Sequence, residues 1–516
     1  MEIQQNISRH SRGNAACATN SPPIAMAPPP SVKIIEELRV AVANTAALPP
    51  KPLRLSALDA QWVTLPLIQR LLIFSDADDV SDNTRPPFAS AVDSLRASLS
   101  ETLAKFPPLA GRIVHQPYSG DAAIDCTAAS VAAAGGVRFI VAEMISEDAA
   151  RLAGEEEHDT EAFRRLVPEL DAGELPAETM AAQVTRLKGG MAIGVAVHHA
   201  VADGRSVWRF LEAWAAACRG GVEDDDDDDV EPPPTFDRKV IEIPGGEELA
   251  RAVLRKRAPD LPKRPINLAL LVPSIARQLW QRSSMAASCA AVAGHLIRPN
   301  LCRRTFTIAA QDMQRLKHRI TDLSPARHVA SPPSSFVAIA SLAWVSFVHS
   351  KYQAGIVSLD DEVYLFFFAD CRTRLNPPPG DDYFGVCISG CLARATTRDL
   401  LVENGVGVAA ALVAEEVRCA AVEPLAGLDW MSTVDGVDLD RLVNLAGSTR
   451  FSAYELADFG WGLPARTELV TMNHDGQVVL VAGKKGHDGT GSVQASVSLH
   501  PAHMGTYKSH FLSYFR

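Results

Sequence analysis

The feature that most constrains the fold is a buried-strand pattern that runs into a short polar turn and then an amphipathic helix. Residues 191–197 (MAIGVAV) alternate small and large apolar side chains, and the preceding Lys188-Gly189-Gly190 favours a hairpin turn. Residues 206–217 (SVWRFLEAWAAA) place their large apolar side chains on one helical face. The succession predicts an α/β fold, because such a helix buries its apolar face against a sheet.

Helical and strand patterns also alternate along the rest of the chain. Residues 93–105 have apolar side chains at helical spacing, and Phe106-Pro107-Pro108 ends that helix. Strands are expected at 363–369 and, with glycine turns between them, across 467–499. A chain of 516 residues exceeds what one hydrophobic core normally organises, so two domains are expected.

The net charge of −11 is concentrated in one acidic run. Residues 223–231 (EDDDDDDVE) are nearly all acidic and precede Pro232-Pro233-Pro234, which predicts a solvated loop. The rest of the chain is close to neutral and has no basic stripe, so nucleic-acid binding is not expected.

Targeting and cysteine patterns narrow the class further. The nine cysteines are scattered without a Cys-x-x-Cys pair, so neither disulfides nor a metal site are expected, and reduced thiols fit a cytoplasmic protein. No apolar run reaches the ~18 residues that cross a bilayer, so no membrane association is expected. Residues 1–32 predict a disordered leader, and whether residues 1–25 belong to the mature protein stays open, because Met26 could be the start.

The turn between the predicted strand and helix carries groups that can do chemistry. An imidazole with a pKa of about 6.5 can remove a proton from a hydroxyl or amine at neutral pH, which makes His199 a candidate base. Asp203, four residues later, could orient the ring or hold the turn. Alone this pair is a weak signal, and no further ligands complete a metal site around it.

A second motif, Asp458-Phe459-Gly460-Trp461-Gly462, lies about 260 residues after His199. In order and separation the two motifs resemble those of the BAHD acyltransferases, a plant family. Segments at 106–112 (FPPLAGR), 370–375 (DCRTRL) and 383–385 (YFG) extend the resemblance over residues 33–512. A kinase interpretation of Asp-Phe-Gly fails, because neither a glycine-rich phosphate loop nor a His-Arg-Asp loop precedes it.

The resemblance implies two similar-sized α/β domains of the chloramphenicol acetyltransferase type with a solvent channel between them. The first domain would span 33–235, a crossover linker 236–275, and the second domain 276–516. A segment after about residue 376 would cross back to the first domain. A monomer is expected.

The resemblance also implies a mechanism. His199 would deprotonate the acceptor, which then attacks the thioester of an acyl-CoA co-substrate in a ternary complex. No permanently bound cofactor is expected, in agreement with the absence of a Gly-x-Ser-x-Gly motif that would indicate an acyl-enzyme.

Supporting roles follow from the same resemblance. In the family the aspartate of the first motif points away from the channel and pairs with an arginine, here Arg372 or Arg374. His198 is expected to be a packing neighbour of the base. The residues expected to support the site from the second motif are Asp458, Gly460, Trp461 and Gly462.

Residues 383–387 (YFGVC) resemble a signature of the clade that acylates sugars on anthocyanins and phenolic glucosides, often from malonyl-CoA. Tyr383 and Phe384 are therefore candidate substrate contacts. Val386 replaces the asparagine of that signature, which leaves open whether activity is reduced.

Three other side chains are candidates for binding the donor. Arg205 could bind the carboxylate of a malonyl group, with a solvated residue in the first helical turn as the alternative. Ser334 and Ser335 lie at an expected helix start, where backbone N–H groups could meet CoA phosphates.

Two other functions stay open. One is hydroxycinnamoyl transfer to another alcohol, an organic acid or a polyamine, and the other is a catalytically inactive paralogue that binds ligand. The acyl donor, the acceptor and the position of acylation are not determined by the sequence.

Overall fold

The computed structural model describes residues 32–76, 85–116, 119–154, 157–220, 232–262, 283–296, 300–323, 332–471, 474–485 and 491–516. The expected leader, apart from its last residue, and the acidic run at 223–231 lie outside the described residues. All structural statements below refer to Val32–Arg516, which cluster as one unit.

The first large sheet is built around the strand predicted at 191–197. Its six strands are ordered β1-β6-β10-β11-β3-β17, and β10 and β11 form the expected hairpin. A Cβ at Gly190 would lie 2.1 Å from the Phe74 carbonyl oxygen, so the hairpin requires glycine there. The strands are β1 (Lys33–Val40), β3 (Ile68–Ser75), β6 (Val137–Asp148), β10 (Met180–Lys188), β11 (Gly190–Val197) and β17 (Arg466–Leu469).

The second large sheet has seven strands in the order β15-β14-β16-β18-β19-β13-β7. It mixes parallel pairs, such as β14 with β16, and antiparallel pairs, such as β18 with β19. The strands are β7 (Glu157–His158), β13 (Cys302–Ile308), β14 (Glu362–Asp370), β15 (Ile388–Thr396), β16 (Leu442–Ser448), β18 (Gln477–Ala482) and β19 (Val493–Leu499).

Two smaller sheets complete the strand pairing among the described residues. A four-stranded sheet has the order β2-β5-β4-β9, and β12 pairs with β8. These strands are β2 (Leu53–Arg54), β4 (Arg112–Gln116), β5 (Asp121–Asp125), β8 (Glu174–Leu175), β9 (Ala177–Glu178) and β12 (Ser283–Ser284).

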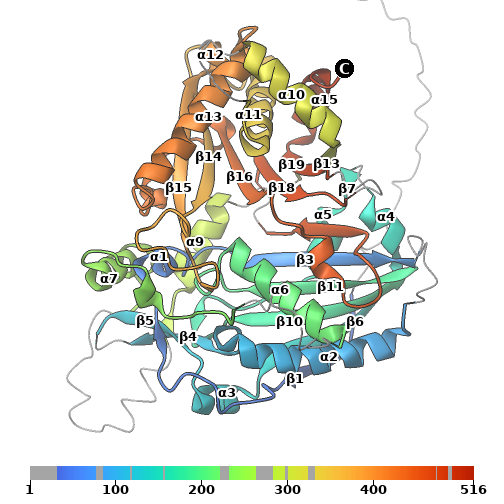
Figure 1. Ribbon diagram of the computed structural model, residues 1–516, viewed down its shortest axis with the longest axis vertical. Helices are drawn as coiled ribbons and strands as arrows, with labels where there is room; N and C mark the ends of the chain where they lie inside the picture. The colour runs from blue at the N-terminus through green and yellow to red at the C-terminus, as the bar shows by residue number, and fades with distance from the viewer. Residues whose placement is uncertain are drawn as a thin grey trace, which may run out of the picture. The chain divides into compact units, whose positions relative to one another are not determined.

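Long helices cover the sheets (Figure 1). Helix α2 extends the helix predicted at 93–105 by five residues at its start, and α6 corresponds to the one predicted at 206–217. Helices α2 and α6 contact each other over the first sheet, while α11 packs between α13 and α15 over the second. The helices are α1 (Ala57–Ala60), α2 (Phe88–Lys105), α3 (Ala128–Ala134), α4 (Ala149–Ala153), α5 (Thr160–Arg165), α6 (Gly204–Cys218), α7 (Gly246–Arg257), α9 (Ala286–Leu296), α10 (Ala310–Leu323), α11 (Ser335–Gln353), α12 (Thr397–Leu401), α13 (Gly405–Val422), α14 (Trp430–Thr433) and α15 (Pro501–Ser513).

The two large sheets exchange strands between distant parts of the chain. Strand β17, from the C-terminal part of the chain, pairs with β3 of the first sheet, and β7, from the N-terminal part, pairs with β13 of the second sheet. The predicted linker at 236–275 contains α7, and its residues 263–275 lie outside the described residues. Helix α11 and its neighbours enclose a second hydrophobic core, separate from the one beneath α2 and α6.

Among the described helices, none is long and apolar enough to cross a membrane. The same residues contain no group of three His, Cys, Asp or Glu side chains arranged to hold a metal ion.

Candidate active site

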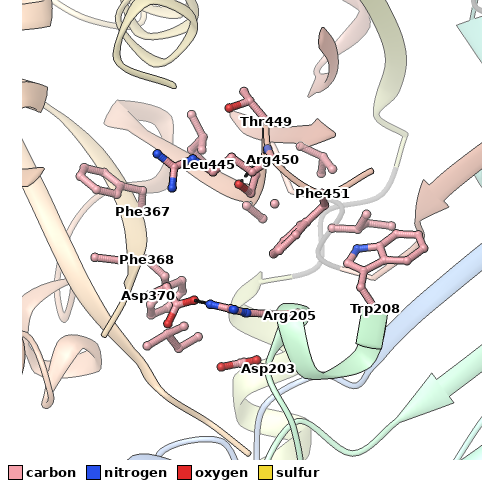
Figure 2. A pocket seen from close by; sticks show the side chains of 18 of the residues that line it. Asp203, Arg205, Trp208, Phe367, Phe368, Asp370, Leu445, Thr449, Arg450 and Phe451 are labelled. Carbon is pink, nitrogen blue, oxygen red and sulfur yellow. Dashed lines mark hydrogen bonds and ion pairs between the residues drawn. The ribbon is translucent and has the colours of Figure 1, made fainter. Parts of the chain in front are cut away.

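A cavity with a volume of about 1170 Å³ is lined by residues from both large sheets and contains the His199 side chain. Trp62, Arg70 and Trp208 line it from the N-terminal half of the chain, and Phe367 and Phe451 from the C-terminal half. Figure 2 shows Trp208 and Phe451 facing the same space as the strand that carries Phe367 and Phe368.

The histidine turn, residues 198–203, is fixed by backbone hydrogen bonds at both ends. The His198 N–H donates to the Thr179 carbonyl oxygen at 2.8 Å, and the Asp203 N–H donates to the Gly385 carbonyl oxygen at 3.3 Å. Asp203 is the N-cap of α6, where its carboxylate accepts from the Ser206 N–H at 3.0 Å. The turn therefore leaves a sheet strand and enters a helix with its backbone groups paired.

The His199 imidazole is half-buried on the cavity wall and stacks on the indole of Trp62. The ring centroids lie 3.7 Å apart with an interplanar angle of 13°. Its Nδ1 atom is buried without a hydrogen-bond partner among the described residues. Burial lowers the pKa of the His199 imidazole to about 3, so the ring is neutral at neutral pH.

The neighbouring His198 is completely buried. Its Nδ1 accepts from the Ala200 N–H at 3.2 Å, and burial lowers the pKa of His198 to about 4. It does not line the cavity, which agrees with the expected packing position.

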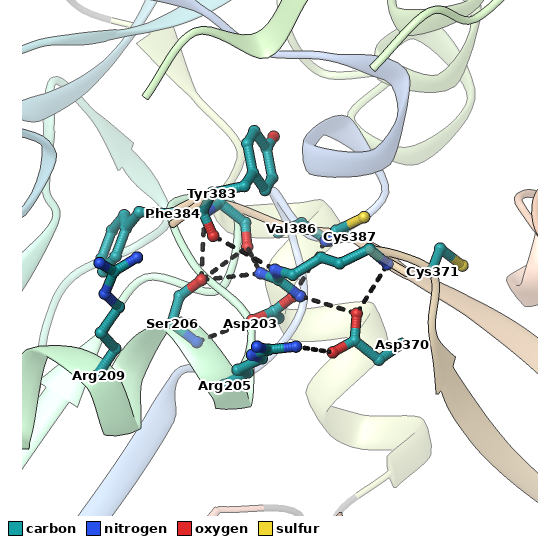
Figure 3. Close-up of polar contacts among 12 residues, drawn as sticks. Asp203, Arg205, Ser206, Arg209, Asp370, Cys371, Tyr383, Phe384, Val386 and Cys387 are labelled. Atoms are coloured by element: carbon teal, nitrogen blue, oxygen red, sulfur yellow. Dashed lines mark hydrogen bonds and ion pairs between the residues drawn. The ribbon is translucent and has the colours of Figure 1, made fainter. Parts of the chain in front are cut away.

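Asp203 lies in the cavity wall, and its carboxylate is held in a buried polar cluster (Figure 3). Its Oδ2 atom lies 2.8 Å from Arg372 Nη1 and accepts from the Cys387 N–H at 3.0 Å. Of the two arginines expected as partners, Arg372 forms the pair. Burial raises the pKa of Asp203, but the Arg372 guanidinium outweighs this and holds it below the ordinary value.

Arg372 links three segments of the chain through the rest of its guanidinium. It donates to Ser206 Oγ at 3.0 Å, to the Gly385 carbonyl oxygen at 3.1 Å and to the Tyr383 carbonyl oxygen at 3.3 Å. Arg374, the other expected partner, lies in the cavity wall, where its Nη1 is buried without a partner among the described residues.

A second buried ion pair, which the sequence did not predict, holds the other side of the same turn. Arg238 Nε lies 3.2 Å from Asp59 Oδ2, and its Nη2 donates to the Val201 carbonyl oxygen at 3.1 Å. Asp59 also accepts from the Val386 N–H at 3.3 Å, while the Val386 side chain is fully buried in the apolar core. The departure from the family asparagine therefore places an apolar side chain against an apolar environment.

Arg205 lies in the first turn of α6 with its side chain 37% exposed, and it pairs with two carboxylates. It lies 3.1 Å from Asp370 Oδ2 and 2.8 Å from Asp381 Oδ1 (Figure 2 shows the first contact). Asp370 and Asp381 would therefore compete with a donor carboxylate for Arg205.

The positions of Tyr383 and Phe384 correct the expectation that they contact substrate. Both are buried in the core and neither lines the cavity. The Tyr383 ring lies 5.6 Å from the guanidinium carbons of Arg238 and Arg372, so it packs between the two buried arginines. Phe384 packs against other aromatic rings of the core.

The second motif forms a turn closed by its own aspartate. Asp458 Oδ1 accepts from the Gly460 N–H at 2.9 Å and from the Gly462 N–H at 3.1 Å. Both glycines have positive φ, 99° and 91°, which other residues rarely adopt. Trp461 is buried against Phe459, and no residue of the motif lines the cavity.

Ser334 and Ser335 lie in the cavity wall at the start of α11, as expected for a helix start facing a ligand. Ser334 Oγ already accepts from the Val337 N–H at 3.2 Å as the N-cap of that helix. Lys317 of α10 lines the same cavity.

Three functional candidates were missed in the sequence, although each left a signal. Arg70 directly precedes the apolar run 71–74 (LLIF) and is the one charged residue of β3. A charged side chain is unusual in such a buried strand. Arg238 belongs to Phe236-Asp237-Arg238, and Trp62 follows a Ser-x-x-Asp capping box. None of these patterns states which side chain it will contact.

The sheet arrangement and the histidine on the wall of a large cavity define a two-sheet α/β acyltransferase fold. The structure superposes on the crystal structure of vinorine synthase with a TM-score of 0.65 and 19% sequence identity. The superposition covers 94% of this chain and 98% of vinorine synthase. A structure of TRI101 from F. sporotrichioides with coenzyme A and T-2 aligns with a TM-score of 0.57 at 16% identity, covering 88% of this chain and 96% of that one. These likenesses concern the fold.

The family follows from the sequence match. The model of the Transferase family matches residues 31–513, so the chain belongs to this family, the BAHD acyltransferases, and is an acyltransferase. Phenolic glucoside malonyltransferase 1 of Arabidopsis thaliana is 29% identical over 490 residues, covering 91% of this chain and 94% of the relative. A malonyl-CoA:anthocyanidin 5-O-glucoside-6''-O-malonyltransferase of the same plant is 28% identical, covering 91% and 95%.

Proposed function

We propose that the protein transfers an acyl group from acyl-CoA, with malonyl-CoA as the donor, to a sugar hydroxyl of a phenolic or flavonoid glucoside. The observation that carries this proposal is a neutral imidazole, that of His199, on the wall of a cavity large enough for two substrates. The donor and acceptor classes are those named for the relatives described above.

His199 acts as the general base in this proposal. Because Nδ1 is buried, Nε2 is the nitrogen that takes the acceptor proton. The acceptor oxygen attacks the thioester carbonyl, the carbon–sulfur bond breaks, and the CoA sulfur receives the proton from the imidazolium. Proton transfer of this type contributes about 10²–10⁴-fold to the rate.

Trp62 orients the base. A histidine in a catalytic triad is oriented by a carboxylate, but here Asp203 is held by Arg372 and cannot serve His199 in that way. The indole face that stacks on His199 fixes the ring plane and favours the imidazolium that forms during the reaction.

The start of α11 is the proposed site for the phosphates of CoA. Helix N-termini carry positive partial charge and unpaired N–H groups, and Ser334, Ser335 and Lys317 line the cavity there. In this proposal the acyl-CoA binds as a co-substrate, and no permanently bound cofactor takes part.

A panel of donors tests the proposal. The purified protein is incubated with malonyl-, coumaroyl- and acetyl-CoA and a mixture of phenolic glucosides, and free thiol and acylated product are measured. We expect malonylated glucoside from the wild type and none from His199→Ala. Product formation by His199→Ala would contradict the base assignment, and coumaroyl transfer without malonyl transfer would contradict the donor class.

A wild-type protein that turns over none of these donors would instead favour an inactive paralogue. A coumaroyltransferase function has its own support, because a coumaroyl-CoA:anthocyanidin 3-O-glucoside-6''-O-coumaroyltransferase 2 of Arabidopsis thaliana is 26% identical. The same panel separates the two donors.

A further inference from the structure

Arg70 is a buried cation in the wall of the cavity that contains His199. It lies on β3 in the middle of the first sheet, opposite Val195 of β11 and Leu469 of β17. The residue is 6% exposed, and it lines the cavity together with Trp62 and His199. Its position therefore places a positive charge deep in the cavity rather than at its rim.

The guanidinium of Arg70 has no carboxylate partner among the described residues. Nη1 donates to the Gln69 carbonyl oxygen at 3.3 Å, Nε is buried without a partner, and the guanidinium carbon lies 5.9 Å from the Trp208 ring centroid. A buried charge without an opposite charge is unfavourable, so an anion bound beside Arg70 would stabilise it.

The acidic side chains of the cavity wall do not supply this anion. Asp203 is held by Arg372, while Asp370 and Asp381 both bind Arg205. Asp382 accepts from Thr235, and Glu212, the other acidic residue of the wall, forms no ion pair with Arg70. The contrast between Arg205, with two carboxylates, and Arg70, with none, separates a structural cation from one left available to a ligand.

Two further observations indicate an anion at this place. Arg70 Nη2 would lie 3.5 Å from a Cβ at Gly204, the first residue of α6, so the guanidinium is next to the positive end of a 15-residue helix. Burial lowers the pKa of Arg70 to about 9, and its charge contributes to the lowered pKa of His199. The two positive groups thus act on the space where the reaction occurs.

We propose that Arg70 binds the free carboxylate of a dicarboxylic acyl donor, malonyl-CoA in the simplest case, and so selects it over donors without that charge. This inference rests on the proposed function, because it assigns the donor pocket of that same site. In a malonyl thioester one methylene separates the carboxylate from the reacting carbonyl carbon. A residue that binds the carboxylate must therefore lie close to the catalytic base, as Arg70 does.

The geometry favours this anion over the phosphates of CoA. The pantetheine arm separates the phosphates from the thioester, so a phosphate at Arg70 would place the thioester away from His199. An arginine also suits a carboxylate, because its planar fork can donate two parallel hydrogen bonds.

The test compares donors in Arg70 variants. We expect Arg70→Gln to lower kcat/KM for malonyl-CoA by about 10- to 100-fold, as loss of charge-assisted hydrogen bonds does, and to change kcat/KM for acetyl-CoA by no more than about 3-fold. Arg70→Lys, which keeps the charge without the fork, should lie between wild type and Arg70→Gln for malonyl-CoA. Arg186→Gln, which removes a surface arginine paired with Glu143, controls for the general loss of positive charge.

Three outcomes would overturn the inference. A parallel loss for both donors would assign Arg70 to the turn or to the reacting carbonyl, and an unchanged donor preference would remove it from recognition. A selective loss of malonyl transfer in Arg205→Gln but not in Arg70→Gln would assign the carboxylate to Arg205.

Equilibrium binding separates this inference from the proposed function. Calorimetry on His199→Ala with and without Arg70→Gln measures affinity for malonyl-CoA and acetyl-CoA without turnover. We expect the second change to weaken only malonyl-CoA binding, by about 10-fold or more. If the wild type transfers no acyl group but this difference holds, the proposed function fails and the carboxylate site stands. Equal affinities in the two proteins reject the carboxylate site alone.

Discussion

The two sides of the histidine turn differ in how their polar groups are satisfied. On one side His199 faces the cavity, stacks on Trp62 and has no carboxylate partner among the described residues. On the other side Asp203 is buried and accepts hydrogen bonds from two backbone N–H groups while pairing with Arg372. The His199 side chain is therefore accessible from the cavity, whereas the Asp203 side chain is used for hydrogen bonds and an ion pair within the fold.

This difference teaches that His199 and Asp203 of the His-x-x-x-Asp spacing form no hydrogen-bonded pair, because the Asp203 carboxylate is taken by Arg372 and two backbone N–H groups. Spacing of four residues suggests a shared function, yet the two side chains have different partners, the Trp62 ring for His199 and the Arg372 guanidinium for Asp203. Activity and stability should therefore respond separately to changes on the two sides. Each prediction below tests that separation.

The largest expected effect is on the His199 side. We expect His199→Gln to lower kcat by about 10²–10⁴-fold, because an amide cannot take the acceptor proton. Its melting temperature should stay close to that of the wild type, since Nδ1 makes no hydrogen bond to the described residues. Steady-state kinetics and calorimetry check both parts. A variant that is destabilised and keeps its activity would show that His199, like Asp203, serves the stability of the fold.

The Asp203 side should show the reverse pattern. Asp203→Asn leaves the Arg372 charge buried without its closest partner, which destabilises the protein by about 3–5 kcal/mol. Chemical denaturation measures this loss. Asp370→Asn is the matched control, because Asp370 also contacts Arg372 but is partly exposed, and its removal should cost much less. Equal losses in the two variants would contradict the special position of Asp203.

A smaller effect is expected from the ring that stacks on His199. Trp62→Leu should lower kcat by about 3- to 30-fold, the range of a cation–π contact, and Trp62→Phe should recover part of that loss. A control is Trp344→Leu, which changes a tryptophan in the second core, away from the cavity. It should reduce stability without changing the pH dependence of kcat. If Trp62→Phe were no better than Trp62→Leu, the stack would not orient the base.

The strand and helix on either side of residues 198–203 could be predicted because they depend on local patterns. The alternation in 191–197 and the helical spacing after Asp203 correspond to β11 and α6 within two residues. The family resemblance supplied the long-range pairing of Asp203 with an arginine, and it left Arg372 and Arg374 as alternatives. Choosing between them requires the backbone path after β14, which brings Arg372 Nη1 to 2.8 Å from Asp203 Oδ2 and leaves Arg374 Nη1 without a partner among the described residues.

What could not be predicted depends on contacts between residues far apart in the chain. Trp62 meets His199, and Arg238 meets Asp59, over separations of more than a hundred residues that no local spacing encodes. Tyr383 was misassigned for a related reason. Its neighbours in the sequence are conspicuous, but its ring fills the space between two buried arginines.

The smallest expected effect is that of pH, and it tests both sides at once. Burial lowers the pKa of His199 to about 3, so acid removes the base only far below pH 6.5. Arg372 holds the pKa of Asp203 below its ordinary value, so the stability from that pair is present above the unfolded pKa and is lost as pH falls through the folded one.

Between about pH 5 and pH 7 neither group should change its charge, and kcat/KM should stay nearly flat. Circular dichroism over the same range should show no unfolding. An acid limb centred near pH 6.5 with the fold intact would mean that the imidazole is far more solvated than its place against Trp62 implies. Unfolding in that range would instead indicate that the Asp203–Arg372 ion pair is lost at a higher pH than expected. The two sides resist acid for opposite reasons, because burial disfavours the cation on one side and a guanidinium favours the anion on the other.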